Sequence, residues 1–190
     1  MSDYLENNGE PIRMESEIMD WKQYTTERRK TAFYPRKVAL FYVLLKLVGE
    51  IAEVSAIAER ADYNQTAVLG ELGDVCWYIA ALQYELGISD LYLLSTNVNN
   101  TLGYADEMFS LYENAASIQQ MVAKAYRDAG GKLTPWQKNS TSIPLIQMLA
   151  NVNWLAIRAG GTLEGVLEAN IAKLADRQAR GVIGGSGDNR

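Results

Sequence analysis

Two pairs of acidic residues stand three positions apart in consecutive apolar segments of the chain. The first pair, Glu50 and Glu53, lies in "GEIAEV", and the second pair, Glu71 and Asp74, lies in "GELGDV". Residues three apart on a helix are neighbours on one face, so each pair offers two carboxylates side by side. Carboxylates grouped in this way are suitable ligands for a hard divalent cation such as Mg²⁺ or Mn²⁺.

The position of each pair relative to the apolar stripe of its segment predicts that the two pairs meet. Leu47 and Val68 are taken as the centres of the two apolar stripes. Around the helix axis, the first acid of each pair lies about 60° from the centre of its stripe, and the second acid lies about 120° from it on the same side. Two such helices with a short connection pack as antiparallel neighbours, which brings four carboxylates to one edge of the interface. Four carboxylates this close repel one another unless cations neutralise them. Gly49, Gly70 and Gly73 would let the helices approach and leave room for phosphate oxygens.

The acid spacing alone has little specificity. In a chain with 23 acidic residues among 190, two such pairs on neighbouring segments arise by chance with an expectation on the order of one. Acids three apart are also commonly part of a solvated helix face. What favours a metal site is the matched placement of both pairs beside their apolar seams.

Composition narrows the classes of chemistry. The chain has no histidine, which excludes His-dependent nucleophilic triads, His–Zn sites and Glu-x-x-His di-iron bundles. The stretch "AGGKLT" lacks the residues of a Gly-rich phosphate loop. A net charge of −5 and a pI near 4.9 argue against a nucleic-acid-binding surface. A divalent cation can nevertheless mediate contact with a phosphate-bearing small molecule.

Cysteine content and hydropathy indicate where the protein is expected to work. The single cysteine, Cys76, allows no internal disulfide and suggests a reducing compartment. The N-terminal "MSDYLENNGEP" is polar and acidic, unlike a signal peptide, and no apolar run approaches the roughly 18–20 residues of a membrane span. We therefore expect a cytoplasmic protein without a membrane segment, whose length suits a single domain.

The positions of proline and glycine divide the chain into helical segments, and no convincing period-2 strand pattern occurs, so the predicted fold is all-α. The expected elements are a polar amphipathic segment over 14–33, helices over 36–61, 67–86 and 104–129, a helix opened by Ser142 and Pro144, and a last helix capped by Thr162 that ends near Arg180. Ser89 could cap a further helix through "DLYLLSTNV". The Gly-rich tail 181–190 is expected to be flexible.

The segments that carry the acids resemble the MazG-type all-α nucleoside triphosphate pyrophosphohydrolases, the superfamily that also includes the dimeric dUTPases. Their motif is Glu-x-x-Glu, a spacer and Glu-x-x-Asp, and here 17 residues separate Glu53 from Glu71. "DWKQYTTERRKTAFYP" resembles the first-helix segment of that superfamily, and "ANIAKLADRQARG" resembles its late Asn-x-x-Lys-Leu-x-x-Arg segment. The resemblance covers roughly residues 20–87 and 162–190.

This resemblance implies an antiparallel helical bundle that forms one domain over 1–190. Its core would comprise about 14–87 and 162–180, and an extra helical region over about 88–161, with at least two helices, would be inserted before the last helix. The region 88–161 is longer than a minimal core of that type needs. It would supply oligomer contacts or a lid.

The resemblance also implies the reaction, which is Mg²⁺-dependent cleavage of a nucleoside triphosphate between its α and β phosphates. A metal-bound water would attack the α phosphate, and the products would be a nucleoside monophosphate and pyrophosphate. On this resemblance Glu50, Glu53, Glu71 and Asp74 ligate Mg²⁺, for which Mn²⁺ could substitute. One of the glutamates, Glu50 before Glu53, would orient or deprotonate the attacking water.

Phosphate contacts are implied for Asn170, Lys173 and Arg177, with Arg190 of the tail as a weaker candidate. Independently of the resemblance, the first three follow i, i+3, i+7 spacing and share one helix face. From the residues alone an alternative stays open, in which Lys173 and Arg177 complement the helix dipole or pair with acids of the same helix.

Oligomerisation is a further expectation, because members of this superfamily generally form dimers or tetramers. Trp77 lies opposite the apolar stripe of its segment, where it would be exposed, buried in a second interface or a stacking platform for a base. A homo-oligomer interface is favoured, because "CWYIAAL" is apolar on more than one face.

Two alternatives without enzymatic activity stay open. One is a helical oligomerisation or regulatory module that has kept the fold and lost the chemistry, although the intact set of four acids argues against it. The other is a metal-binding helical bundle without hydrolase activity. No residue pattern specifies the base or the sugar of a nucleotide.

Overall fold

The computed structural model describes residues 19–58, 64–89, 91 and 103–182. Its elements are α1 (Trp21–Arg28), the 3-10 turns η1 (Arg29–Thr31) and η2 (Arg36–Val38), α2 (Ala39–Ala58), α3 (Gln65–Leu86), α4 (Tyr104–Ala129), α5 (Pro135–Arg158) and α6 (Leu163–Ala179). Within these residues there is no strand, and the predicted all-α fold is confirmed. No helix in the described part of the chain combines the length and apolarity that crossing a membrane requires.

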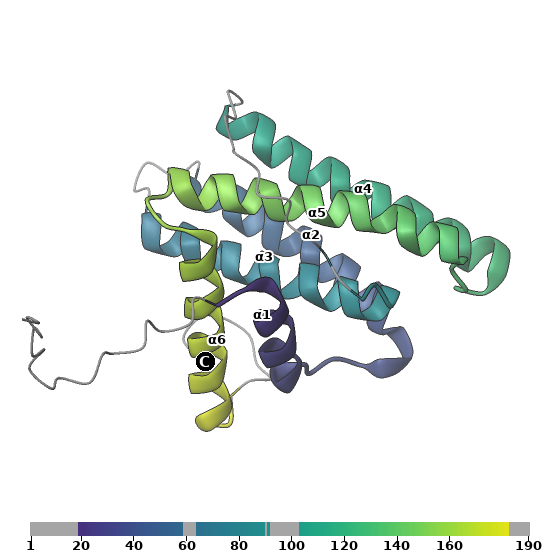
Figure 1. Ribbon diagram of the computed structural model, residues 1–190, viewed down its shortest axis with the longest axis horizontal. Coiled ribbons are helices and arrows are strands. Elements are labelled where there is room, and N and C mark those ends of the chain that lie inside the picture. The colour runs from purple at the N-terminus through teal and green to yellow at the C-terminus, as the bar shows by residue number, and fades with distance from the viewer. Residues whose placement is uncertain (1–18, 59–63, 90, 92–102, 183–190) are drawn as a thin grey trace, which may run out of the picture.

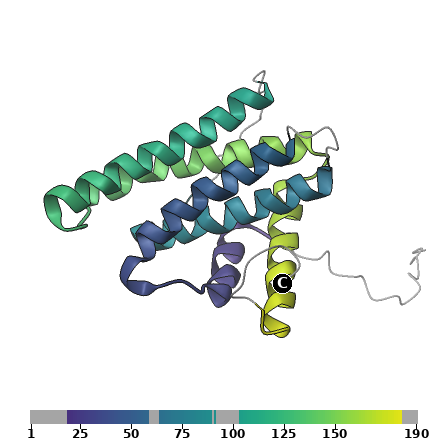
Figure 2. The ribbon, with the colours of Figure 1, turned by 180° about the vertical axis from the view of Figure 1, so that it is seen from behind.

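Helix α3 lies at the centre of the molecule. It packs beside α2, with α5 on another side, while α6 and α1 cross it (Figure 1). Helices α4 and α5 form a second long pair, and α4 also contacts α2, as the view from behind shows (Figure 2). One hydrophobic core contains side chains from each of the six helices in the described residues.

The central position of α3 changes the interpretation of its apolar sequence. "CWYIAAL" was expected to face an oligomer partner, but Cys76, Trp77 and Ile79 through Leu82 are buried by other helices of the same chain. The fully buried Leu72, Ile79 and Leu82 each contribute roughly 1.5–3 kcal/mol through burial. Apolar residues on several faces therefore reflect a helix surrounded within its own chain.

Helix boundaries that depend on local capping agree with the sequence. The side chain of Asn64 accepts a hydrogen bond from the backbone N–H of Ala67 and begins α3. Gly87 (φ 69°) ends α3 and Gly130 (φ 59°) ends α4, both in the left-handed conformation that favours glycine. Thr162 caps α6 through a bond from Gly165 N–H, as predicted. The two helices expected within 88–161 are present as α4 and α5.

The predicted start of the fifth helix was wrong. Helix α5 begins at Pro135, where Thr134 forms a capping box with Gln137, and Pro144 lies inside the helix. A proline at the first helical position loses no helical hydrogen bond, so Thr134-Pro135 is the better start signal. In the turn before Pro144 the hydroxyl of Thr141 donates to the Lys138 carbonyl (2.6 Å). The helix continues through Pro144 because Pro144 and its neighbour Leu145 are buried in the core.

Some sequence predictions lie outside the described residues. The helix expected after Ser89 falls almost entirely on residues 90 and 92–102, and the tail prediction falls mostly on 183–190. Of the expected segment 14–33, the described part contains α1 and η1.

Candidate metal centre

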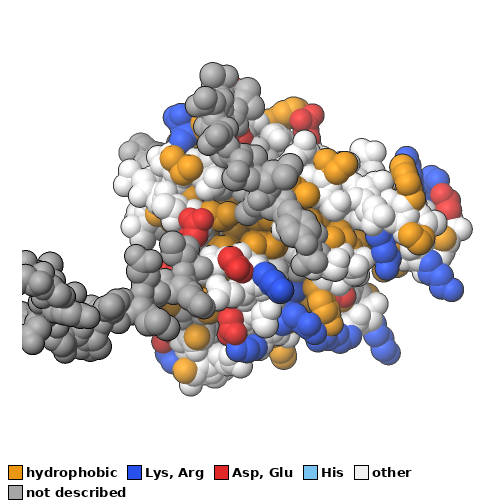
Figure 3. Space-filling view, viewed as in Figure 1, with side chains coloured by type: hydrophobic (Ala, Val, Ile, Leu, Met, Phe, Trp, Pro, Cys, Tyr) orange, Lys and Arg blue, Asp and Glu red, His pale blue; other side chains and the backbone are white. Residues whose placement is uncertain are grey.

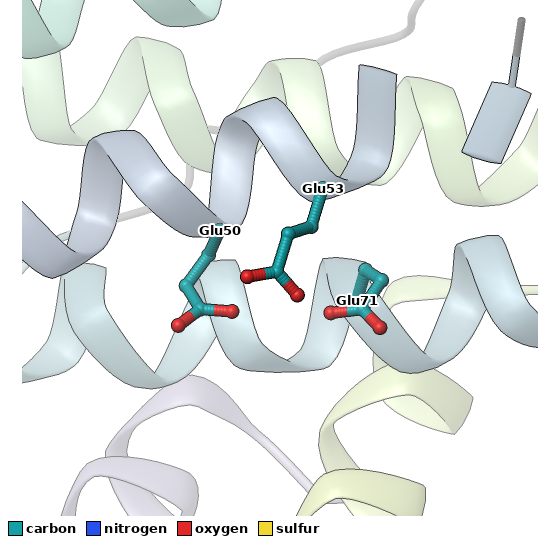
Figure 4. A group of neighbouring side chains, drawn as sticks. All are labelled: Glu50, Glu53 and Glu71. Atoms are coloured by element: carbon teal, nitrogen blue, oxygen red, sulfur yellow. The ribbon is translucent and has the colours of Figure 1, made fainter. Parts of the chain in front are cut away.

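Three of the four predicted carboxylates converge between α2 and α3. Glu50 and Glu53 extend from α2 toward α3, and Glu71 lies opposite them on α3 (Figure 4). Each glutamate offers an oxygen atom within 4.8 Å of the others. Glu50 is 6 % exposed and Glu71 is 9 % exposed, whereas Glu53 faces solvent. This arrangement presents oxygen ligands from two helices to one point that remains open to solvent on the Glu53 side.

The electrostatic environment of Glu50 disfavours its ionised form. Burial raises the pKa of Glu50, and the negative charges of Asp74 and Glu53 raise this pKa further. Lys46, one turn earlier on α2, opposes these effects through an ion pair of 2.8 Å to the Glu50 carboxylate. A divalent cation at the cluster would relieve the same repulsion more completely, since it carries two positive charges.

Asp74 lies beside the three glutamates, but its carboxylate is held by α6. The Nζ of Lys173 is 2.8 Å from Oδ1 and 2.7 Å from Oδ2 of Asp74. The side-chain amide of Asn170 donates to Oδ1 at 2.9 Å. The hydroxyl of Tyr24 in turn donates to Oδ1 of Asn170 at 2.8 Å, which fixes the orientation of that amide. Thus α1, α3 and α6 position one carboxylate together.

The predicted phosphate-binding residues have different positions. Asn170 is 2 % exposed and directs its amide to Asp74, so it acts here as a positioning residue. Lys173 is partly exposed, with its ammonium at the same carboxylate. Arg177 is 4 % exposed and lies seven residues beyond Asn170, about 10 Å along the axis of α6. Arg190 lies outside the described residues.

The three glycines beside the acids have different surroundings. A Cβ at Gly73 would lie 3.0 Å from the Cβ of Asn170, so the absence of a side chain lets α6 approach α3 at Asp74. A Cβ at Gly49 or Gly70 would meet no heavy atom within 4 Å. Close helix approach therefore explains Gly73, whereas the space beside Gly49 and Gly70 is open.

A mainly apolar groove of about 350 Å³ adjoins this network between α3 and α6. Leu69 and Gly70 form its α3 side, and Val166 and Ala169 form its α6 side. Asn170 and Lys173 also line the groove, so it is continuous with the ion pair at Asp74. A ligand in this groove would have one end beside the carboxylates.

Trp77 does not provide the interface that the sequence suggested. The side chain is 8 % exposed, its indole N–H donates to the Thr31 hydroxyl at 3.1 Å, and the Arg28 guanidinium lies 5.2 Å from its ring. The prediction of an oligomer contact at Trp77 is therefore corrected, because α1 and η1 of the same chain cover this residue.

Sequence reasoning missed two residues that organise the site. Lys46 could have been recognised from its i, i+4 spacing to Glu50, which places the two side chains on adjacent turns of one helix face. Tyr24 carries no local signal, because its partner Asn170 is 146 positions away in the chain.

Comparison with known proteins identified a phage relative. The chain is 31 % identical over 109 residues to the Gene 37 protein of Mycobacterium phage L5, and the match covers 56 % of this chain and 96 % of that protein. No family model matches the chain, and no solved structure matches it either. The near-complete coverage of the phage protein shows that the chain belongs to the same family as the Gene 37 protein of Mycobacterium phage L5.

Proposed function

We propose that this protein is a Mg²⁺-dependent nucleoside triphosphate pyrophosphohydrolase, which cleaves a ribo- or deoxyribonucleoside triphosphate to the monophosphate and pyrophosphate. The observation that carries the proposal is the convergence of Glu50, Glu53 and Glu71 within 4.8 Å, from two consecutive helices. The resemblance of the acidic motifs to MazG-type enzymes supports the same reaction. Mg²⁺ or Mn²⁺ fits the site because all its ligands are carboxylate oxygens.

In this proposal the three glutamates and Asp74 hold the metal ions. Bound Mg²⁺ would supply positive charge against the triphosphate and acidify a water molecule. Glu50 is the favoured general base, because its carboxylate extends from α2 to the place where the three glutamates converge. Glu53, which is exposed, would orient that water from the solvent side.

Lys173 and the neighbouring groove account for substrate binding. With a metal held at Asp74, the partly exposed Lys173 ammonium would be available to bind a phosphate oxygen of the substrate. The apolar groove of about 350 Å³ has space for a base and sugar beside the phosphates. Asn170 would keep Asp74 in place through its hydrogen bond of 2.9 Å.

The direct test is pyrophosphate release from a panel of ribo- and deoxyribonucleoside triphosphates with Mg²⁺, Mn²⁺ or EDTA. We expect metal-dependent turnover of at least one nucleotide, with loss of activity in Glu53→Gln and Asp74→Asn. Glu113→Gln, which replaces an exposed acid of α4, is the matched control and should retain activity. Absence of turnover with every nucleotide, or wild-type activity in both site variants, would refute the proposal.

A metal-binding bundle without hydrolase activity is distinguished by measuring the two properties separately. Titration of the protein with Mn²⁺, followed by calorimetry, reports the metal site without any nucleotide. Binding that depends on Glu53 and Asp74, together with no turnover of the nucleotide panel, would favour this alternative. Absence of both metal binding and turnover would favour an oligomerisation or regulatory module.

We further propose a homo-oligomer that acts in the cytoplasm, where nucleoside triphosphates and Mg²⁺ are available. Val38, Phe41 and Leu45 are exposed at i, i+3, i+7 spacing on η2 and α2, which gives one apolar face for a second copy. Light scattering of the purified protein measures the assembly, and Leu45→Lys should shift it toward the monomer. A monomeric wild-type protein would contradict the homo-oligomer.

A further inference from the structure

Arg28, the last residue of α1, is buried without a full set of partners. It is 1 % exposed, and its Nη2 donates to the Ala80 carbonyl at 3.0 Å. Among the described residues, its Nε and Nη1 atoms have no hydrogen-bond partner. Buried donors on a charged group are costly to leave unsatisfied, which makes this side chain unusual in a folded protein.

Within the part of the chain that the structure describes, the charge of Arg28 also lacks an ion pair with a carboxylate. Burial lowers the pKa of Arg28, and the neighbouring charge of Arg29 lowers this pKa further, although Tyr34 opposes both effects. Glu85, the acid on the adjacent part of α3, accepts the Tyr34 hydroxyl at 2.6 Å and lies 3.8 Å from Arg36. The aromatic rings of Trp77 and Tyr84 lie 5.2 Å and 5.9 Å from the guanidinium. They contribute cation–π attraction but no counter-ion.

A cavity of about 340 Å³ adjoins this arginine. Among the described residues, its lining combines two guanidinium groups with hydroxyl and amide groups and contains no acidic side chain: Thr25, Thr26, Arg28, Arg29, Ala80, Gln83, Tyr84, Ile88 and Ser89. The cavity therefore combines positive charge with hydrogen-bond donors, which is the composition of an anion site.

The surrounding segment adds positive charge to an acidic protein. Lys and Arg side chains gather on the surface over α1 and the residues after it (Figure 3). Residues 22–37 contain six cations and only one acid, Glu27, whose carboxylate is paired with Lys30 at 2.6 Å. An anion that approaches Arg28 thus enters a locally positive field, although the whole chain carries a charge of −5.

We propose that the cavity at Arg28 and Arg29 is a binding site for a phosphate group, separate from the carboxylate cluster. The exposed Arg29 guanidinium can donate two parallel hydrogen bonds to a tetrahedral dianion, and the Thr25 and Thr26 hydroxyls can rotate to donate others. The buried Arg28 adds a second positive charge to the wall of the cavity. Ala80 on α3 lies six residues beyond Asp74, about 9 Å along the helix. The ligand is inorganic phosphate or a phosphate monoester, and its binding needs no metal.

The test measures phosphate binding in the presence of EDTA, so that it does not depend on the proposed catalytic metals. Inorganic phosphate and adenosine monophosphate are titrated separately into the full chain, with calorimetry and thermal denaturation as readouts. We expect saturable binding with a dissociation constant on the order of 1 mM or lower. Tighter binding of the monophosphate identifies a phosphate ester as the ligand, and equal binding identifies the phosphate group alone.

Variants connect the binding to the cavity. Arg28→Met should abolish the increase in melting temperature caused by phosphate, and Arg29→Gln should weaken binding about tenfold. Arg29 is exposed, so its variant tests the site even if Arg28→Met does not fold. Arg158→Met, at the exposed end of α5, is the matched control and should bind phosphate normally. No phosphate binding by the wild type, or unchanged binding in Arg29→Gln, would overturn the proposal.

Discussion

Buried acids occur in two regions of this protein, and their surroundings differ. In the pair of helices α4 and α5, Glu107 is fully buried and accepts a hydrogen bond from the side-chain amide of Asn151. The carbonyl of that amide accepts the Ser110 hydroxyl at 3.3 Å. Between α2 and α3, by contrast, the carboxylates approach one another. Burial raises the pKa of Glu50, and the neighbouring charges of Asp74 and Glu53 raise this pKa further.

This difference separates a structural acid from a candidate ligand. Asn151 is a neutral donor to the Glu107 carboxylate, and among the described residues no buried oxygen of Glu107 lacks a hydrogen-bond partner. The glutamates of α2 and α3 instead direct several oxygens to one place, which is favourable only when they are protonated or bound to a cation. Convergence of acids, rather than their burial, marks the functional region.

Glu71→Gln should have the largest effect, because it replaces a ligand of the convergent set by a neutral amide. We expect pyrophosphate release to fall at least about 100-fold, with a change of about 1 kcal/mol or less in the free energy of unfolding. Kinetics and thermal denaturation of the same preparations measure both quantities. Unchanged activity per folded molecule would mean that Glu71 is not part of the site. The carboxylates of α2 and α3 would then differ less from the structural acid Glu107.

Asn151→Leu should lower the stability of the protein and leave its activity unchanged, the reverse of the result expected for Glu71→Gln. Loss of the amide removes a donor from the buried Glu107 carboxylate, so we expect destabilisation of about 2–3 kcal/mol, with activity per folded molecule retained. Asn139→Leu, at an exposed position of the same helix, is the control for helix propensity. Urea denaturation measures the difference. A specific loss of activity in Asn151→Leu would show that α4 and α5 contribute to the chemistry.

Two glycine variants test how tightly the site is packed. Gly73→Ala places a methyl group 3.0 Å from the Cβ of Asn170, which must shift and disturb Asp74, so we expect about tenfold lower kcat/KM. Gly49→Ala adds a methyl group in open space and should stabilise the protein by up to about 1 kcal/mol. Equal kcat/KM in Gly73→Ala and wild type would show that the position of Asn170 is not critical.

The smallest expected effect is a pH dependence of stability in the metal-free protein. The pKa of Glu50 in the folded state is raised above its ordinary value of 4.5, so the folded state binds this proton more tightly than the unfolded state. The stability from protonated Glu50 is therefore present below pH 4.5 and is lost as the pH rises through the raised pKa. Glu50→Gln lacks this contribution.

Urea denaturation in EDTA across this pH range, for wild type and Glu50→Gln, measures the effect. We expect the wild type to lose stability relative to the variant as the pH rises. If the stability difference between wild type and variant does not change with pH, the pKa of Glu50 is not raised in the folded protein.

The sequence alone determined the helical fold and many helix ends, because these depend on contacts within a few residues. Asn64, Gly87 and Thr162 act through local hydrogen bonds or backbone conformation, and their roles can be predicted without a fold. The shared face of Glu50 and Glu53 follows from helix geometry in the same way. Pro144 shows the limit of such local reasoning. A proline disfavours a helix interior, but Pro144 lies inside α5 and is buried in the core.

Only the tertiary structure decided which partners these side chains have. It joins Lys173 to Asp74 across 99 positions of sequence, and Tyr24 to Asn170 across 146. It also covers Trp77 with η1 and leaves Arg28 buried beside a cavity. The physical reason is that helix propensity and capping act locally, whereas ion pairs, burial and cavities depend on how distant helices pack.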